Sequence, residues 1–315
     1  MSMLERLLPW RVLKARGIMG MNKRNGDYIA VYNNRSLYPL VDDKLKTKRL
    51  AEDAGVAVPK LYAVVEIERQ IKSLSEKLET YSDFVVKPAH GSGGEGILVI
   101  TKRTSKGFRK SNGQIISEQE LGRHISNILS GMYSLGGLPD TALIEQRVKF
   151  DPVFADVSYQ GVPDVRTIVF RGVPVIAMLR LPSRMSDGKA NLHQGAVGVG
   201  IDLKTGRTSA GVWNEQVIVH HPDTAMPIAD LQIPNWEEIL KLTAHCYDLV
   251  GLGYIGVDIV LDKQHGPLML EMNARPGLSI QIANRCGLLH RLEKIESMDS
   301  IPDSIEQRVA IAQSL

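Results

Sequence analysis

The chain has 315 residues, of which 43% are hydrophobic, 5% aromatic and 23% charged. These proportions are typical of a folded globular protein, and they exclude a disordered or fibrous chain. The sequence holds no run of about 20 apolar residues, so we do not expect an integral membrane protein. Its two cysteines cannot build a disulfide framework, and they favour free thiols in a reducing, cytoplasmic setting.

Positive charge is concentrated at the start of the chain. The net charge is +3, yet residues 1–49 hold eleven Lys/Arg against four Asp/Glu. Residues 3–16 place leucine and valine near helical spacing with arginine and lysine between them, which predicts a basic amphipathic helix. Such a helix is typical of contact with a membrane surface or another protein, and a solvated basic face is the alternative. Nucleic acid is not expected as a partner, because the basic stretch over 102–110 lacks a series of interleaved aromatic residues.

Helices and strands are expected in mixed order along the rest of the chain. The first part predicts helices over 42–54, 66–80 and 117–129 and strands over 61–65, 84–88 and 97–100. The part after residue 140 predicts strands over 142–148, 165–170, 173–181, 217–219, 254–261 and 268–272, with one helix from residue 235 to about 250. This layout indicates an α+β fold in which antiparallel sheets carry helices.

A glycine-rich loop follows the apolar strand that ends at Lys87 and Pro88. Four of the six residues from 91 to 96 are glycine. Glycines let backbone N–H groups approach phosphate oxygens, and a lysine fixed at a strand end adds a positive charge. Because a strand follows, we expect a hairpin loop over nucleotide phosphates. A glycine hairpin with a purely structural role is the alternative.

Three polar side chains lie in the last two predicted strands. Asp258 lies within the first strand, and Glu271 and Asn273 lie two residues apart on its hairpin partner, so the latter two share a face. Carboxylate and amide oxygens are the ligands that Mg²⁺ prefers, and such groups are costly to bury inside apolar strands unless a cation satisfies them. We therefore expect a metal site here. A structural polar network is the alternative.

Two further segments are weaker candidates for nucleotide contacts. The strand ending in Glu145, Gln146 and Val148 has the pattern of a hinge that reads adenine through its backbone and Glu145. Asp164, in Pro163-Asp164-Val165-Arg166, is placed to take ribose hydroxyls. Neither pattern is specific by itself.

Taken in this order, the residues resemble the ATP-grasp superfamily over about residues 40 to 290. The motifs nearest to RimK-type α-L-glutamate ligases are Asp43-Lys44-Leu45-Lys46, Val85-Val86-Lys87-Pro88, Asp164-Val165-Arg166, Asn191-Leu192-His193-x-Gly195 and Glu271-Met272-Asn273-Ala274-Arg275-Pro276-Gly277. The segments at 21–25 and 38–44 look more like the α-L-glutamate ligase-like and sugar-transfer-associated ATP-grasp branches.

The resemblance implies an ATP-grasp fold, in which two α+β lobes grip ATP. It implies a phosphate, adenine and ribose site formed by Lys44, Lys87, Gly91, Ser92, Gly93, Gly94, Glu145, Gln146, Val148 and Asp164. The metal ligands would be Asp258, Glu271 and Asn273, holding Mg²⁺ with Mn²⁺ as an alternative. The positions near the γ-phosphate and acyl-phosphate, the implied catalytic residues, are Arg180, Asn191, His193 and Arg275.

The resemblance also implies a domain plan and an activity. We expect a basic N-terminal segment over 1–41, a small lobe over 42–140, a C-terminal lobe over 141–295 and a tail over 296–315. Ligases of this type carry a Rossmann-like domain before the position of Lys44, and here only 43 residues precede it, so a reduced N-terminal region is expected. Insertions over 102–110 and 207–234 also depart from the family pattern.

The expected activity is an ATP- and Mg²⁺-dependent carboxylate–amine ligase. It would form an amide through an acyl-phosphate, adding glutamate or another amino acid to a small-molecule or peptide acceptor. A phosphotransferase and a non-catalytic ATP-binding partner protein are the alternatives.

Overall fold

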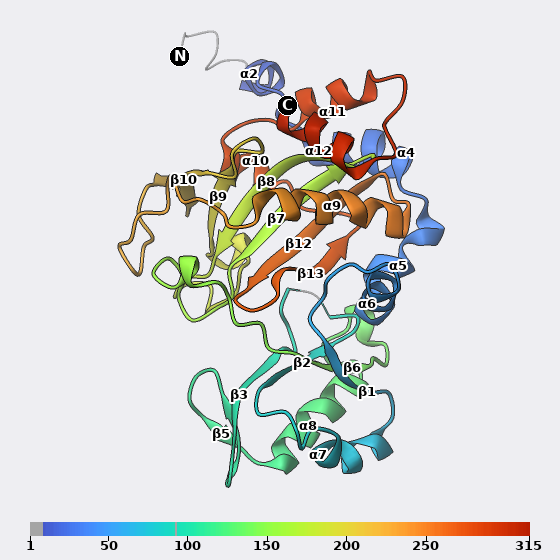
Figure 1. The fold of residues 1–315 in the computed structure, drawn as a ribbon, viewed down its shortest axis with the longest axis vertical. Helices are drawn as coiled ribbons and strands as arrows, with labels where there is room; N and C mark the ends of the chain where they lie inside the picture. The colour runs from blue at the N-terminus through green and yellow to red at the C-terminus, as the bar shows by residue number, and fades with distance from the viewer. Residues whose placement is uncertain (1–8, 92) are drawn as a thin grey trace.

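The computed structural model describes residues 9–91 and 93–315. Two antiparallel sheets form its frame, a six-stranded sheet in the order β1-β6-β2-β3-β4-β5 and a seven-stranded sheet in the order β11-β10-β9-β8-β7-β12-β13. Figure 1 shows the smaller sheet below the larger one, each with its own helices. The α+β class with antiparallel sheets is thereby confirmed.

The smaller sheet follows the predicted strands closely. Its strands are β1 (Leu61–Val65), β2 (Phe84–Pro88), β3 (Leu98–Thr104), β4 (Gly107–Lys110), β5 (Ile115–Ile116) and β6 (Ala142–Glu145). Helix α8 (Glu118–Leu129) begins at the expected capping box, in which Ser117 and Glu120 bind each other's backbone N–H groups. The helix expected over 66–80 is instead a 3₁₀ helix, η3 (Glu68–Ser73), followed by α7 (Leu74–Lys77).

The smaller sheet extends past residue 140, the predicted end of the small lobe. Strand β6 lies between β1 and β2, and it pairs antiparallel with both. Its residues Ala142 and Ile144 belong to the apolar core under α8. The chain therefore leaves this sheet only after Glu145.

The larger sheet contains two strands that the sequence did not indicate. Its strands are β7 (Asp164–Phe170), β8 (Val173–Leu181), β9 (Val197–Ile201), β10 (Thr208–Trp213), β11 (Gln216–Ile218), β12 (Tyr254–Asp262) and β13 (Gly266–Asn273). β9 and β10 were not predicted; in the Val-Gly-Val-Gly-Ile sequence of β9 every second residue is glycine, which is depleted in strands. The expected hairpin of β12 and β13 is confirmed, with Asp258 directly opposite Glu271.

The two faces of the larger sheet pack against different elements. Helix α9 (Trp236–Val250) covers the face that carries Val165 and Val257. The other face carries Ile168, which packs with residues of α10 (Ser279–Asn284), α11 (Leu289–Glu296) and the N-terminal segment. Helix α12 (Ile305–Gln313) packs against α9 and β8. Since successive strand residues alternate faces, Asp164, Arg166 and Asp258 lie on the face away from α9.

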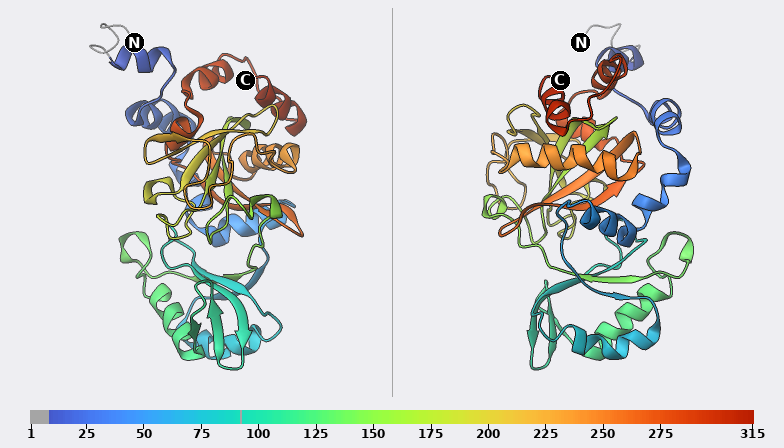
Figure 2. Two further views of the ribbon diagram at one scale, coloured as in Figure 1. Left: turned by 90° about the vertical axis from the view of Figure 1, so that its left-hand side faces the viewer. Right: turned by 45° about the vertical axis from the view of Figure 1, so that its right-hand side comes forward.

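The N-terminal segment runs along one side of the larger sheet to the region between the sheets (Figure 2). Its elements are α2 (Pro9–Ala15), α3 (Met21–Lys23), the π-helical turn η1 (Arg24–Ile29), α4 (Ala30–Tyr32), η2 (Arg35–Leu37), α5 (Pro39–Asp42) and α6 (Lys44–Asp53). The basic helix expected over 3–16 is thus present from Pro9, and residues 3–8 lie outside the described residues. Among the described residues, no helix is long and apolar enough to cross a membrane.

Asn33 joins this segment to the two strands expected to hold the metal. Its side-chain amide donates to the backbone oxygens of Tyr254 and Ala274, at 2.7 and 3.0 Å, and its oxygen accepts the Tyr254 N–H at 2.8 Å. Only 3% of Asn33 is exposed. Because buried backbone groups are costly to leave unpaired, Asn33 fixes the start of β12 relative to the end of β13.

We therefore expect Asn33→Ala to lower the free energy of unfolding by about 2–3 kcal/mol, since three buried polar groups lose their partner. Asn34→Ala is the matched control, because Asn34 caps only the exposed η2 and its loss should cost about 1 kcal/mol or less. Urea denaturation followed by circular dichroism measures both values. Equal stability of the two variants would contradict the bridging role of Asn33.

Candidate active site

A buried carboxylate lies between two lysines at the end of the smaller sheet. Glu145, on β6, has one oxygen 2.6 Å from Lys87 Nζ, and Lys87 ends the neighbouring strand β2. The other oxygen of Glu145 lies 3.0 Å from Nζ of Lys48, on α6. Lys48 also donates to the backbone oxygen of Pro59. All three charged side chains are buried, so each needs its partners.

The two lysines favour the charged form of Glu145 in spite of its burial. Burial disfavours the Glu145 carboxylate, but Lys87 and Lys48 hold its pKa below the ordinary value. Burial lowers the pKa of Lys48, and Glu145 opposes this shift. The Glu145 carboxylate is thus occupied by lysines, and its expected contact with adenine stays a prediction. Sequence reasoning missed Lys48, although its place four residues after Lys44 on one helix was a usable signal.

Lys44 begins α6, next to the glycine-rich loop. Asp43 caps the helix by accepting the N–H groups of Leu45 and Lys46. Lys44 Nζ donates to the backbone oxygen of Gly91 at 2.5 Å. Burial lowers the pKa of Lys44, and nearby Glu271 opposes that effect. The helix thus places a lysine against the loop that the sequence predicted to cover phosphates.

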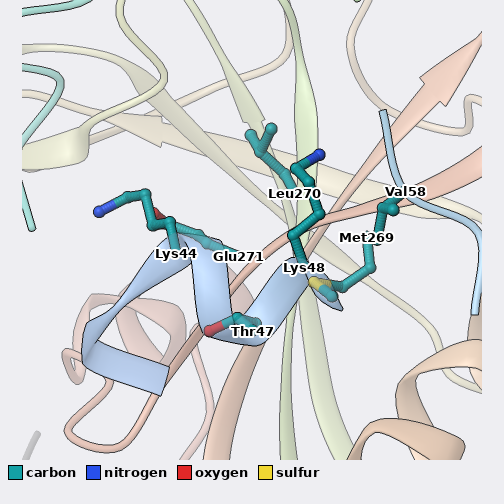
Figure 3. Close-up of a pocket in the computed structure, with 7 residues that line it drawn as sticks. All are labelled: Lys44, Thr47, Lys48, Val58, Met269, Leu270 and Glu271. Atoms are coloured by element: carbon teal, nitrogen blue, oxygen red, sulfur yellow. The ribbon is translucent and has the colours of Figure 1, made fainter. Parts of the chain in front are cut away.

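A pocket lies between α6 and β13 (Figure 3). It is lined by Lys44, Thr47, Lys48, Val58, Met269, Leu270 and Glu271. Two lysines of one helix thereby line the same pocket as Glu271, a residue of a predicted metal strand.

The glycine-rich loop connects β2 and β3, which pair as the expected hairpin. Gly93 and Gly94 have φ of 63° and 79°, a region that favours glycine. A side chain at Gly91 would lie 2.3 Å from the Pro88 ring, so this position also requires glycine. Ser92 lies outside the described residues.

The tip of this loop meets a loop of the larger sheet that contains two predicted catalytic residues. Gln194 Nε2 lies 3.5 Å from the Gly93 oxygen, and Lys189 Nζ lies 3.6 Å from a Glu95 oxygen. Asn191 accepts the His193 N–H at 3.0 Å. His193 is exposed, and its Nε2 lies 3.3 Å from Ser279 Oγ. The structure therefore brings the glycine-rich loop next to Asn191 and His193.

A row of alternating charges crosses four adjacent strands of the larger sheet. Arg180 on β8 donates to both oxygens of Asp164 on β7, at 2.5 and 2.7 Å. Its Nη2 also donates to Oδ2 of Asp258 on β12 at 2.6 Å. Arg166 on β7 donates to both Asp258 oxygens, at 2.6 and 2.5 Å, and lies 3.8 Å from Glu271 on β13. We call these five residues the charge row.

The charge row shows how two predicted site residues are held. Each oxygen of Asp164 accepts one bond from Arg180, and the expected contact of Asp164 with ribose stays a prediction. Arg180 is itself buried between two carboxylates, and these raise its pKa against the effect of burial. Its Nε and Nη2 are engaged in these pairs, and its expected contact with an acyl-phosphate stays a prediction. Sequence patterns showed that these residues matter but not that they bind each other.

The expected metal donors lie together at the end of the charge row. Asp258 faces Glu271 across β12 and β13, and Gly256 faces Asn273 two pairs further along. Burial would raise the pKa of Asp258, but Arg166 and Arg180 hold it below the ordinary value, so it is a carboxylate at neutral pH. Asn273 Oδ1 accepts the Arg275 N–H at 2.7 Å.

The chemistry of this donor set fits Mg²⁺. Asp258 Oδ1 accepts one hydrogen bond and Oδ2 accepts two, whereas a carboxylate offers about four acceptor positions. Glu271 is only partly buried, and its closest arginine atom is 3.8 Å away. Across residues 9–91 and 93–315, no group of three or more His, Cys, Asp or Glu could hold a metal by itself. Any ion here would therefore need Asn273, substrate oxygens or water as further ligands.

The remaining predicted residues lie around these groups. Arg275 is exposed, 5.1 Å above the Tyr38 ring and 3.6 Å from Asp42. The Gln146 N–H donates to the Lys60 oxygen, so this group is not free for adenine. Val148 is buried against Val260 and Leu268.

The fold and the site define a class: two antiparallel sheets that place lysines, a glycine-rich loop and oxygen donors near one another fit the ATP-grasp type. The model of the sugar-transfer associated ATP-grasp family matches residues 23–297. The chain belongs to this family, and the expected resemblance to the sugar-transfer-associated branch is confirmed.

Individual relatives are more distant. A probable alpha-L-glutamate ligase of Maridesulfovibrio salexigens is 28% identical over 115 residues, which cover 36% of this chain and 27% of that protein. The D-alanine–D-alanine ligase of Bacillus anthracis complexed with ATP is 14% identical over 90% of this chain and 70% of that chain, with a TM-score of 0.47. The ATP-grasp ligase PsnB complexed with a minimal precursor is 14% identical over 89% of this chain and 63% of that chain, with a TM-score of 0.44. The match thus spans about a quarter of the curated relative's length and less than two thirds of PsnB.

We expect Glu145→Gln to lower the free energy of unfolding by about 3–5 kcal/mol, because it leaves two buried lysines without their shared counter-ion. Glu238→Gln, on the exposed side of α9, is the matched control and should change stability by about 0.5 kcal/mol or less. Chemical denaturation without nucleotide measures both variants. A Glu145→Gln protein as stable as the control would show that the lysines do not depend on Glu145.

Proposed function

We propose that the chain is an ATP- and Mg²⁺-dependent carboxylate–amine ligase that forms an amide through an acyl-phosphate. The observation that carries this proposal is the pocket between α6 and β13, in which Lys44 and Lys48 lie beside Glu271. Membership in an ATP-grasp family supports ATP as the bound nucleotide. The opposed Asp258 and Glu271 support a divalent cation on its phosphates.

The lysines and the glycine-rich loop would bind the phosphates. Lys44 and Lys87 supply positive charge, and the backbone of Gly91 to Gly94 supplies N–H donors. Glu145 keeps Lys87 in place through their 2.6 Å ion pair. On this view Glu145 acts by orienting a phosphate-binding lysine, while the backbone near Val148 remains the proposed adenine contact.

Asp258, Glu271 and Asn273 would hold the metal, and the same oxygen donors would accept Mn²⁺. When bound, Mg²⁺ would offset negative charge on the β- and γ-phosphates during transfer. The charge row keeps Asp258 ionised, because Arg166 and Arg180 hold its pKa below the ordinary value. The metal strands are in turn fixed by Asn33 at their open ends.

The reaction needs no protein nucleophile. A carboxylate oxygen of the acceptor attacks the γ-phosphorus of ATP, the bond to the β-phosphate oxygen breaks, and ADP leaves. The amine nitrogen then attacks the acyl carbon, phosphate leaves, and the nitrogen loses a proton. Arg275, whose guanidinium is exposed at the site, would stabilise charge on the acyl-phosphate oxygens. Asn191 and His193 would line the same side through the loop that meets Gly93.

For the substrates we propose only chemical classes. Similarity to a probable alpha-L-glutamate ligase supports glutamate or another amino acid as the amine. The acceptor would be a peptide or a small carboxylate. A cytoplasmic site of action is part of the proposal, and the two free thiols, buried Cys246 and half-buried Cys286, agree with it.

The direct test is ADP release from the purified chain with pools of amino acids, short peptides and small carboxylates. Mass spectrometry of the same mixtures should find an adduct equal to the two substrates less one water. Release of ADP together with a phosphorylated product, and without any amide, would replace the ligase by a phosphotransferase. Tight ATP binding without turnover in any pool would favour a binding protein instead.

Asp258→Asn should lower the rate of ADP formation at least about 100-fold, because a neutral amide is a poor ligand for a hard divalent cation. Asp230→Asn, which removes an exposed partner of Arg207, is the matched control and should keep the original rate. Circular dichroism establishes that both variants are folded. A wild-type rate in Asp258→Asn would remove Asp258 from the metal site.

A further inference from the structure

Two arginines of the charge row bind Asp258, and they differ in how many of their hydrogen bonds go to it. Arg180 divides its donors between Asp164 and Asp258, with two bonds to the first and one to the second. Arg166 gives both of its bonds to Asp258. A cation that binds Asp258 therefore competes mainly with Arg166.

The position of Arg166 is consistent with a partner of Asp258 that a metal ion can replace. It lies directly opposite Asp258 on β7, whereas Glu271 lies opposite Asp258 on β13. Arg166 Nη2 is 3.8 Å from Glu271 Oε1, so this guanidinium stands close to both proposed metal ligands. An ion between the two carboxylates and a guanidinium beside them carry charge of the same sign, so they repel each other.

Asp164 has a different place in the row. Its side chain is 6% exposed, and both oxygens bind Arg180. Strand register puts Asp164 opposite Val260, two residues beyond Asp258, so it adjoins the proposed metal pair without being part of it. Its negative charge is therefore directed at Arg180. Without Asp164, Arg180 would have Asp258 as its nearest carboxylate.

We propose that Asp164 is a positioning residue that takes two of the three hydrogen bonds of Arg180 and so limits the charge that Arg180 presents to Asp258, and that Arg166 is the cation that the metal displaces from Asp258. The inference rests on the proposed function, because it takes Asp258 and Glu271 as metal ligands. Asp164 and Arg180 then control how readily the metal binds, which is a role beyond the ribose and acyl-phosphate contacts that their motifs suggested.

The proposal predicts opposite effects for two changes in the same row. Removing Arg166 removes a competitor and a repelling charge, so the metal should bind more tightly. Neutralising Asp164 leaves the whole charge of Arg180 to Asp258, so the metal should bind more weakly. If the charge row had only a structural role, both substitutions would lower the stability of the chain and would leave its affinity for the metal unchanged.

The experiment measures Mn²⁺ binding to the full chain by the electron paramagnetic resonance signal of free Mn²⁺. A non-hydrolysable ATP analogue is present and all carboxylate substrates are absent, so the readout does not depend on turnover. We expect Arg166→Gln to lower the dissociation constant of Mn²⁺ about tenfold and Asp164→Asn to raise it about tenfold. Asp164→Glu keeps the charge, and it should stay nearer to the wild-type constant than Asp164→Asn does.

Arg207→Gln and Asp230→Asn are the matched controls, since they alter an exposed Arg–Asp pair of the larger sheet and should leave the constant unchanged. Weaker or unchanged Mn²⁺ binding in Arg166→Gln would overturn the proposal, and so would unchanged or tighter binding in Asp164→Asn. If Asp164→Asn does not fold, Arg166→Gln decides by itself. A wild-type chain that binds no Mn²⁺ overturns the metal assignment of the proposed function. If the wild-type chain binds Mn²⁺ and the variants bind it with the same dissociation constant, only this inference is overturned.

Discussion

Buried charges need counter-charges, and the site of this protein is arranged around that requirement. Glu145 satisfies two lysines that come from different parts of the chain, Lys87 from the smaller sheet and Lys48 from α6. The larger sheet meets the same requirement with two arginines and two aspartates on neighbouring strands. Because each group would be costly to bury alone, the charged residues can only occur as sets. Their pairing fixes where the free donors and acceptors remain.

The N-terminal segment belongs to this arrangement as a structural part of the larger lobe. Its Tyr28 and Ile29 are buried with Phe170 and Tyr254 in one apolar cluster. Gln281 binds both backbone groups of Met19, so the chain just beyond the metal strands is tied to the same segment. A stretch that its charge alone would assign to a solvated surface therefore supports the strands of the proposed metal site.

Sequence patterns were most informative where a residue acts through its own chain neighbours. The capping box at Ser117, the cap at Asp43 and the hairpin that opposes Asp258 to Glu271 depend on local spacing, and all three are present. The roles assigned to Asp164, Arg180 and Glu145 depended on partners far away in the chain. Those partners are set by strand order, with β7 between β8 and β12, and no local spacing encodes that order.

The same reason explains what was missed. Lys48 has an ordinary helical position, and its burial follows only from the packing of α6 beside β6 and Pro59. β9 lacks the usual strand signal because alternate residues are glycine, and Gly198 and Gly200 leave room for Leu192 and Asn284. In both cases tertiary packing, and not the local sequence pattern, determines the observed structure.

The contacts between the glycine-rich loop and the loop before β9 have a consequence for the timing of the proposed catalytic cycle. Among the described residues they include one long hydrogen bond, from Gln194 to Gly93, and one partly exposed ion pair, between Lys189 and Glu95. Contacts of this kind contribute about 1 kcal/mol or less each. In the proposed ligase, parting the two loops would therefore add only a small barrier to nucleotide exchange, and the residence time of ADP would be governed by its phosphate and metal contacts.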